Sequence, residues 1–475
     1  MKISIQKDVS KKRIVMIVYV LAMFMAALDA TITNVALPSI GATFQVPPAA
    51  TGAINVGYLV SLAMFLPVSG WLGDRFGTKR VFLFSLMTFT IASLLCAVAP
   101  NLFMLNVFRV IQGAGGGLLT PVGMAILFRT FSPAERPKIA RMLVLPIAVA
   151  PALGPIVGGI LVDSLSWRWI FYINLPIGLL AIFIGLLFLH EHVEEKPGRF
   201  DIKGFLLSVP GFSMLIYALT QGASKGWNAP EVVITGVIGL ILMVVLCVVE
   251  WNTSEPMLNL RLFKDPVFRN MCMISFCSAA ALFGMLYVFP LMYQNALQAS
   301  ATDTGLTTFP EALGLMLSSQ MLPHSLKRLG VKRLMIVSLI GSIVVFTLIA
   351  ISVSANPWFI RFLMFNVGIF LGHAVGAVQA TAFHNISLSS MGRATTLFQV
   401  QNRLGSVVGV AILASVMGVM EGQVGSQQID LMTYQWSLFG SAIFLSLALV
   451  VAINLKQLDT VPTKAMPVKA PAKAN

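Results

Sequence analysis

The sequence predicts an all-α polytopic membrane protein, and two features of its composition carry that prediction. Of the 475 residues, 57% are apolar and only 11% are charged, whereas soluble domains carry roughly 25% charged residues. A membrane-spanning helix needs about 20 mainly apolar residues, so the apolar residues suffice for about fourteen spans with short loops. No polar stretch is long enough to form a soluble enzyme domain on a membrane anchor. The composition also excludes a disordered or fibrous chain.

Charge-poor apolar runs place the expected spans in order along the chain. We expect fourteen of them, at 14–38, 50–72, 81–99, 102–127, 142–163, 170–189, 204–221, 232–250, 271–293, 304–323, 334–354, 358–383, 404–420 and 435–455. An even number of spans places both termini on the same side of the membrane.

The distribution of Lys and Arg tests this order of spans and orients the chain. The side of the N-terminus holds 28 of the 32 basic residues, in the segments before 14, at 73–80, 129–141, 190–203, 252–270, 324–333 and 384–403, and in the tail. The opposite side holds Arg168, Lys225 and Arg361, and Arg109 alone lies inside an expected span. Since basic residues favour cytoplasmic loops, we expect cytoplasmic termini. The net charge of +14 then reflects topology, and we expect no nucleic-acid binding.

An internal repeat divides the chain. The segment from Asp74 to Val81 (DRFGTKRV) resembles the segment from Lys327 to Leu334 (KRLGVKRL), which lies 253 residues later. The first segment follows the second expected span and the second follows the tenth, so two spans lie inserted between two six-helix bundles. Such repeats are typical of secondary transporters, whose substrate site lies between the halves. Chance similarity of two basic turns is the alternative.

The repeat predicts the domain organisation. We expect an N-terminal six-helix bundle at 1–203, two linker helices at 204–269, and a C-terminal six-helix bundle at 270–455. Residues 456–475 are rich in Pro, Ala and Lys, and we expect a disordered cytoplasmic tail that lies against anionic lipid.

Five motifs in the expected order resemble the major facilitator superfamily (MFS), and within it the fourteen-helix drug:proton antiporter group. They are the loop signature Gly70–Arg80 (GWLGDRFGTKR), the R-x-x-Q-G pattern of Arg109, Gln112 and Gly113, the antiporter motif Gly154–Gly159 (GPIVGG), and the group's segments Leu28–Pro38 and Trp167–Pro176. The resemblance covers nearly the whole chain. It implies the MFS fold with fourteen spans and proton-coupled multidrug efflux. One departure is Ala150, where the antiporter motif usually has another glycine.

Asp29 and Arg109 are the first candidates for proton coupling. Asp29 lies sixteen residues after Arg13, which is about 24 Å along a helix and past the membrane midplane. A carboxylate withheld from bulk water could take up a proton near neutral pH, and a lipophilic cation could compete with that proton. The alternative is that Asp29 caps or pairs locally in the outer vestibule. Arg109 needs a partner, and Asp29 is a candidate. The resemblance implies that Arg109 takes part in proton coupling, and a structural buried pair is the alternative.

Glu311 and His373 are further candidates for contact with substrate or protons. Glu311 lies in the tenth expected span, where the repeat aligns it with Tyr58, and it could bind a cationic drug or carry the proton. The alternative is a solvated residue near the outer mouth. His373 lies in the middle of the twelfth span and has a suitable intrinsic pKa. A hydrogen-bonded packing residue is the more frequent role for a lone histidine.

The basic loop after the second span is a candidate conformational latch. Asp74 could interact with a helix N-terminus of the opposite half, and Arg75 with a nearby acidic group. Together with Gly77, these contacts would hold the outward-open state. Orientation by positive charge alone is the alternative, which explains Lys79 and Arg80 but not Asp74.

The antiporter motif predicts a flexing seam. Gly154, Gly158 and Gly159 form a small-residue face that permits close helix approach, and Pro155 can kink the fifth span. We expect this seam between the bundles, as a barrier to ion leak. Ordinary tight packing is the alternative.

Several functions lack the residues that they require. No G-x-x-x-x-G-K-[ST] loop is present, so ATP is not expected as the energy source. The sequence has no serine or cysteine nucleophile with a base at suitable spacing, so we do not expect an enzyme. We also expect no cofactor. The four cysteines, Cys96, Cys247, Cys272 and Cys277, lie in apolar runs, where we expect neither a disulfide nor a metal site.

The sequence therefore predicts a proton-driven exporter of amphipathic, cationic or aromatic compounds in the bacterial cytoplasmic membrane. Its expected partners are small-molecule substrates, protons and lipid, and no segment indicates a periplasmic adaptor. A specific metabolite or lipid exporter of the same fold is the alternative within transport. A non-transporting membrane scaffold or sensor is the alternative outside it.

Overall fold

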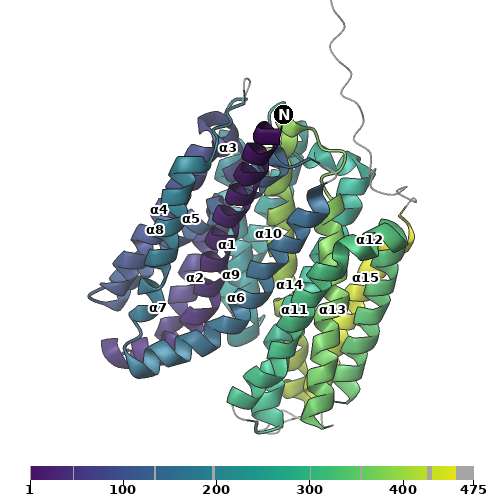
Figure 1. Cartoon of the computed structure of the whole chain (residues 1–475). Helices are drawn as coiled ribbons and strands as arrows, with labels where there is room; N and C mark the ends of the chain where they lie inside the picture. The colour runs from purple at the N-terminus through teal and green to yellow at the C-terminus, as the bar shows by residue number, and fades with distance from the viewer. Residues whose placement is uncertain are drawn as a thin grey trace, which may run out of the picture.

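The computed structural model describes residues 2–46, 48–132, 135–194, 198–299, 301–352, 356–424 and 431–455. In these ranges the chain folds into helices joined by short turns (Figure 1). The helices are α1 (Lys2–Phe44), α2 (Pro48–Phe65), α3 (Ser69–Phe76), α4 (Thr78–Ala97), α5 (Leu102–Thr130), α6 (Arg136–Ser164), α7 (Trp169–Tyr172), α8 (Asn174–Phe188), α9 (Ile202–Lys225), α10 (Pro230–Asn252), η2 (Leu260–Lys264), α11 (Pro266–Leu291), η3 (Met292–Ala296), α12 (Ala301–Ile351), α13 (Pro357–Thr381), η4 (Leu388–Ser390), α14 (Met391–Val424) and α15 (Leu431–Ile453).

The all-α polytopic architecture is confirmed. Within the described residues, eleven helices are long and apolar enough to cross a membrane, or up to twelve if the bent pair α2 and α3 forms one span. The expected spans 304–323 and 334–354 both fall in α12, and the expected span 142–163 falls in α6, several of whose side chains lie outside the described residues. The number fourteen stays a prediction.

The helices form two bundles with a hairpin beside them. Helices α1 to α8 pack among themselves, and so do α11 to α15. Figure 1 shows the two groups side by side, meeting at the end that carries the N-terminus and diverging toward the other end. The boundaries proposed at 203 and 270 stay a prediction, and the tail 456–475 lies outside the described residues.

The end that carries the N-terminus is where polar and aromatic contacts join the two bundles. Helices α3 and α5 of the first bundle touch α14 of the second. The contacts are Ser69 Oγ to Thr396 Oγ1 at 2.9 Å, Thr395 Oγ1 to the Pro121 carbonyl at 3.1 Å, Arg129 Nε to the Leu388 carbonyl at 3.3 Å, and the rings of Phe128 and Phe383 with centroids 4.6 Å apart. The structure is therefore closed between the bundles at this end.

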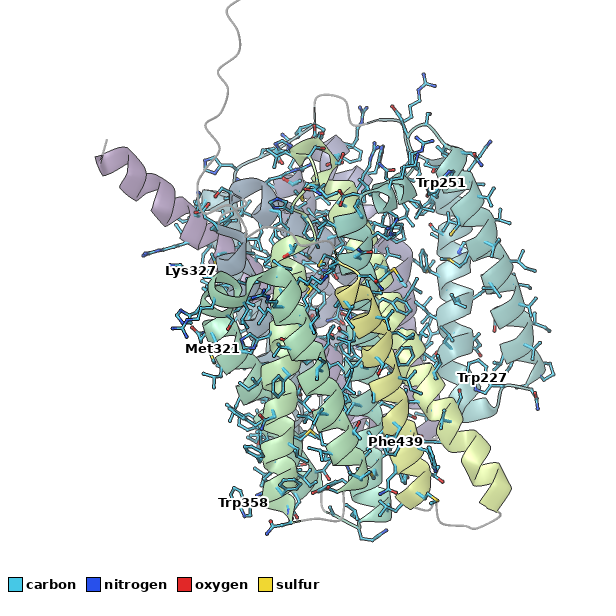
Figure 2. The ribbon with its side chains drawn as sticks, turned by 90° about the vertical axis from the view of Figure 1, so that its right-hand side faces the viewer. Trp227, Trp251, Met321, Lys327, Trp358 and Phe439 are labelled. Atoms are coloured by element: carbon cyan, nitrogen blue, oxygen red, sulfur yellow. The ribbon has the colours of Figure 1, made fainter. Side chains whose placement is uncertain are left out.

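Helices α9 and α10 form the inserted hairpin. They pack against each other, and α9 also touches α2 and α14, so the hairpin lies beside the junction of the two bundles. Figure 2 places Trp251 and Trp227 near opposite ends of the hairpin. The Trp227 indole Nε1 donates to Ser415 Oγ on α14 at 2.6 Å, which ties the turn of the hairpin to the second bundle.

The outer surface is apolar, as the membrane assignment requires. Phe84, Phe183 and Val244 expose 64%, 63% and 57% of their surface on α4, α8 and α10. A monomeric soluble protein rarely exposes extended apolar surface of this kind, whereas lipid tails solvate it. These faces are therefore the lipid-facing surface of the chain.

The internal repeat appears in the backbone. Gly77 joins α3 to α4 with φ of +98°, and Gly330 interrupts α12 with φ of +70°. A positive φ is readily adopted by glycine alone, so both basic loops place glycine where the chain turns between two helices. The shared turn fits a repeat of the two bundles, which stays a prediction.

One boundary differs from the sequence prediction in a way that matters below. Helix α14 begins at Met391, whereas the apolar run predicts a start at 404. The extra turns carry Thr395, Thr396 and Gln399, which contact the first bundle instead of lipid. The apolar run therefore begins later than the helix itself. The charge distribution predicts a cytoplasmic loop for Arg403, whereas the structure places this residue inside a candidate span.

Candidate functional site

A buried polar cluster surrounds Asp29 in the middle of the first bundle, where α1, α4, α5 and α8 converge. Arg109 Nη1 donates to Asp29 Oδ2 at 2.6 Å, while Gln112 Nε2 and Asn174 Nδ2 donate to Asp29 Oδ1 at 3.0 and 2.8 Å. The same two amides reach Ser93 Oγ at 2.7 and 3.3 Å. All five side chains are fully buried. The carboxylate is thus neutralised by one cation and held by three donors.

Aromatic rings cover the guanidinium of Arg109. Its Cζ lies 4.3 Å from the ring centroid of Tyr58 and 5.7 Å from that of Phe171, distances at which the ring faces attract the cation. Arg109 Nε and Nη2 have no hydrogen-bond partner among the described residues. Among the described residues, Asp29 is therefore the only counter-ion of Arg109, while Gln112 Oε1 accepts a further hydrogen bond from Nη1 at 2.6 Å and the rings cover part of the guanidinium.

This arrangement can act as a proton-dependent switch. A buried ion pair is stable while both charges are present, and removing one leaves the other uncompensated in a medium of low dielectric. Protonation of Asp29 would remove its negative charge and with it the attraction for Arg109. The protonated carboxyl oxygen would then be a hydrogen-bond donor instead of an acceptor. The negative charge of this one carboxyl is thus what neutralises the buried cation.

The structure brings Asp29 and Arg109 together, as their candidate pairing requires. It places Asp29 in the interior of the first bundle and not in an outer vestibule, with 0% of its surface exposed. Sequence reasoning missed Ser93 and Asn174. Asn174 lies in the quoted segment that ends at Pro176, so a signal was present, but which helices converge on Asp29 is a property of the fold.

Glu311 occupies the position in the second bundle that Tyr58 occupies in the first. A Cβ on Gly113 would meet the Tyr58 carbonyl, and a Cβ on Gly368 would meet the Glu311 carbonyl, so the same close helix contact recurs. Glu311 is 8% exposed, and its carboxyl makes no hydrogen bond or ion pair with any described residue. Unlike Asp29, its carboxyl has no counter-ion among the described residues.

His373 is held by hydrogen bonds on both ring nitrogens. Nδ1 lies 2.7 Å from Ser318 Oγ and 2.8 Å from the Ile369 carbonyl, and Nε2 lies 3.1 Å from Ser325 Oγ. The side chain is 6% exposed. These contacts tie α13 to α12 and match the hydrogen-bonded packing role that is the more frequent one for a lone histidine.

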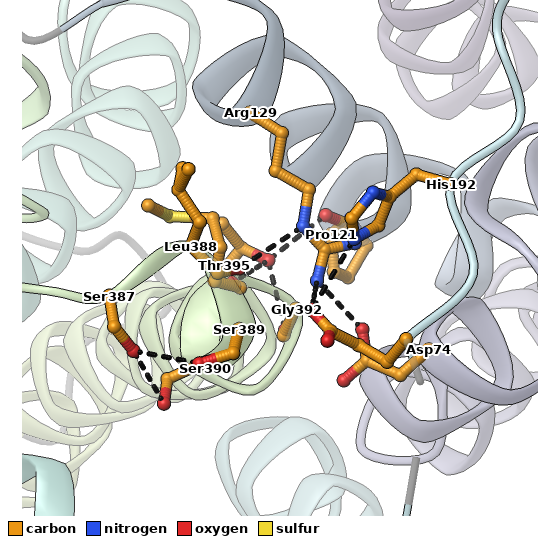
Figure 3. Close-up of polar contacts among 12 residues, drawn as sticks. Asp74, Pro121, Arg129, His192, Ser387, Leu388, Ser389, Ser390, Gly392 and Thr395 are labelled. Carbon is orange, nitrogen blue, oxygen red and sulfur yellow. Dashed lines mark hydrogen bonds and ion pairs between the residues drawn. The ribbon is translucent and has the colours of Figure 1, made fainter. Parts of the chain in front are cut away.

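A second buried charge cluster joins the bundles at the N-terminal end (Figure 3). Arg129 Nη2 donates to Asp74 Oδ1 at 2.9 Å and to Glu194 Oε1 at 3.3 Å, while Nε donates to the Leu388 carbonyl of the second bundle. A Cβ on Gly392 would lie 2.7 Å from Asp74 Oδ1. Asp74 therefore sits against the first turn of α14, where the helix dipole favours a negative charge.

Arg75 contacts no acidic group in this structure, so its part in a latch stays a prediction. It is exposed and makes no hydrogen bond or ion pair with the described residues, because α3 turns it away from the interface while Arg129 of α5 reaches the acidic groups. Gly77 holds the turn, and a Cβ there would collide with the Glu191 carboxylate. That carboxylate accepts from the backbone N–H of Lys79 at 2.9 Å, which satisfies one of the free donors at the start of α4.

The glycines of the antiporter motif face a neighbour within their own bundle. A Cβ on Gly154 would meet Thr31, and one on Gly158 would lie 2.9 Å from Ile32 Cγ1, both on α1. Gly159 has nothing within 4 Å of its Cβ position, because it lies about 100° around the helix from Gly158. Two of the three glycines therefore form a close contact between α6 and α1. Helix α6 also packs against α12 and α13 of the second bundle, and the flexing seam between the bundles stays a prediction. The ring of Pro155 lies outside the described side chains.

Among the described residues, no group of three or more His, Cys, Asp or Glu side chains could hold a metal ion. The four cysteines are free thiols.

Comparisons with known proteins agree with this architecture. The 31% identical multidrug resistance protein B homolog of Mycobacterium tuberculosis (strain ATCC 25618 / H37Rv) aligns over 405 residues, which are 84% of this chain and 75% of that relative. Among solved structures, the human organic anion transporter MFSD10 superimposes with a TM-score of 0.67 at 15% identity, over 93% of this chain and 99% of that one. The proton:xylose symporter XylE gives 0.65 at 14% identity, over 93% and 95%.

The family model described as the Major Facilitator Superfamily matches residues 19–410 and, in a second match, 271–472. The two matches together cover both bundles, and members of this family are multi-pass membrane transporters, not enzymes. The chain belongs to the Major Facilitator Superfamily.

Proposed function

We propose that this transporter exports amphipathic, cationic or aromatic compounds from the cytoplasm in exchange for protons. The observation that carries the proposal is the Asp29–Arg109 pair, in which the carboxylate is the only counter-charge, among the described residues, of a fully buried cation. Placing such a pair inside membrane-spanning helices is energetically costly. Binding and release of the transported proton by Asp29 would explain why the pair is present. The name of the mycobacterial relative, a multidrug resistance protein, supports the substrate class.

The proposed cycle is alternating access of residues 1–203 against 270–475. The concentration of basic residues on the side of the N-terminus supports its placement in the cytoplasm, so the closed end of the structure would be the cytoplasmic end and the state outward-open. In this state Asp29 is paired. A proton that reaches Asp29 would release Arg109, loosen α5 against α1, and favour opening toward the cytoplasm, where substrate displaces the proton.

Glu311 is the proposed contact for a cationic substrate or a second proton. Its carboxyl is free of partners among the described residues and is not fully sealed from solvent. A lipophilic cation would find there a counter-charge that Asp29, already occupied by three donors, does not offer.

The test is transport of ethidium into inside-out membrane vesicles with an acidic lumen. Wild-type protein should accumulate dye in proportion to the pH gradient, and Asp29→Asn should abolish this dependence. Asp163→Asn is the matched control, because Asp163 is exposed at the far end of α6 and should transport normally. Glu311→Gln should weaken ethidium transport specifically. Equal transport by wild type and Asp29→Asn would contradict the coupling role. Failure of every dye while one metabolite moves would favour a specific exporter.

A further inference from the structure

A second cation lies inside the membrane-spanning region, on the face of α14 that is turned toward the first bundle. Gly392, Thr396 and Gln399 on this face contact Asp74, Ser69 and Met124 of the first bundle. Arg403 follows Gln399 by four residues, which is about one turn, so it points in the same direction. It lies one turn beyond the last of these contacts, on the side where the bundles diverge.

Other sides of α14 are already occupied, which fixes the direction of Arg403. Asn402 donates to Ser275 on α11 at 2.9 Å, and a Cβ on Gly405 would meet the Phe276 carbonyl of the same helix. Ser415 meets the α9–α10 hairpin through Trp227. Arg403 shares none of these faces. The guanidinium therefore lies between the bundles and not in lipid.

Arg403 is open to solvent and has no partner. It falls in the exposed class although it lies near the middle of α14, and it makes no hydrogen bond or ion pair with any described residue. The carboxylate of Asp29 is already occupied by three donors from its own bundle.

An unpaired guanidinium at this depth is costly unless it serves a ligand. Its planar fork matches a carboxylate or a similar oxyanion through two parallel hydrogen bonds. In the first bundle, the ring of Tyr58 is stacked on Arg109 and supplies an aromatic surface there. Together these groups suit an aromatic ring that carries a negative group.

We propose that Arg403 is the anion-binding residue of the substrate site, so that substrates include aromatic amphipaths bearing a carboxylate or sulfonate. The inference rests on the proposed export function and narrows its substrate class beyond cations. Within the site, Glu311 and Arg403 offer opposite charges from the second bundle, so one transporter accommodates cationic, anionic and zwitterionic compounds.

Equilibrium binding to purified protein in detergent tests this assignment without any proton gradient. The probes are 1-naphthoate and its uncharged isostere 1-naphthamide, measured by isothermal titration calorimetry on wild type, Arg403→Gln, Arg403→Lys and Arg269→Gln. Arg269 is an exposed basic residue of α11 that makes no contact with the described residues, so its variant matches the change in net charge.

Wild type should bind naphthoate about 10- to 100-fold more tightly than naphthamide, the range expected for a charged hydrogen-bonded contact. Arg403→Gln should lose this preference while retaining naphthamide binding, which also shows that the variant is folded. Arg403→Lys should keep part of the preference, and Arg269→Gln all of it. An unchanged preference in Arg403→Gln, or no preference in wild type, would overturn the assignment. Ethidium transport by the Asp29 variants is measured separately, so failure of proton coupling would leave this result intact.

Discussion

The buried pair of Asp29 and Arg109 makes a quantitative prediction about stability. Replacing Asp29 by Leu removes the acceptor of three side chains and leaves Arg109, which is 0% exposed, without a counter-charge. Breaking a buried ion pair from one side costs about 3–5 kcal/mol. The single variant Asp29→Leu should therefore lose about that much free energy of unfolding.

The double variant Asp29→Leu/Arg109→Leu separates the pair from simple loss of packing. The amides of Gln112 and Asn174 already reach Ser93, so part of the polar cluster survives when both charges are gone. We expect a coupling energy of about 2–3 kcal/mol, so that the double variant is much less destabilised than the sum of the two single variants.

The assay is unfolding in mixed micelles of increasing sodium dodecyl sulfate, followed by intrinsic tryptophan fluorescence. Asp163→Leu, at an exposed site, controls for the loss of a carboxylate and should change the free energy of unfolding by less than about 0.5 kcal/mol. A cost below about 1 kcal/mol for Asp29→Leu, or additive costs in the double variant, would refute the account of a mutually dependent buried pair.

Three further predictions concern the loops at the N-terminal end and their controls. Gly77→Ala should lower the free energy of unfolding by about 1–2 kcal/mol, because φ is +98° there; Gly159→Ala, with nothing within 4 Å, should be neutral, and equal costs would contradict the argument. Arg129→Gln leaves Asp74 without its cation, so hydrogen exchange should rise in residues 69–76 and 391–399; unchanged protection there would argue against a latch. Burial works to raise the pKa of Glu135, but hydrogen bonds from a neighbouring serine and lysine outweigh it and hold that pKa below its usual range. The stabilisation from Glu135 is therefore present at neutral pH and lost as the pH falls below about 4. The free energy of unfolding of Glu135→Gln should therefore fall less steeply with decreasing pH in the acid range than that of wild type. An equally steep fall in both proteins would contradict this.

The helical architecture follows from the sequence because apolar length and basic loops are local properties of the chain. The repeat of two basic loops also predicts a shared turn, and Gly77 and Gly330 both have positive φ. These features need no knowledge of which helices touch.

The site could be predicted only in part. Asp29 and Arg109 stand out because charges are rare in apolar runs, but Ser93 and Asn174 are ordinary polar residues whose role depends on four helices converging. The distinction between Gly158 and Gly159 likewise requires knowing which neighbour α6 faces.

Two arginines show where hydropathy misleads. Arg129 and Arg403 were both assigned to basic loops because each lies at the edge of an apolar run. The structure buries Arg129 against Asp74 and places Arg403 inside helix α14. A polar face that is turned toward a second bundle has the same composition as a loop, so composition alone cannot separate the two.

The most direct test of the central claim measures proton movement together with substrate. In inside-out vesicles with an acidic lumen, a pH-sensitive acridine dye reports the gradient while ethidium is added from outside. The account predicts that ethidium partly dissipates the gradient in wild type and in Asp163→Asn, and leaves it unchanged in Asp29→Asn. Ethidium-induced proton release that persists in Asp29→Asn would contradict the claim that the Asp29–Arg109 pair couples proton to substrate.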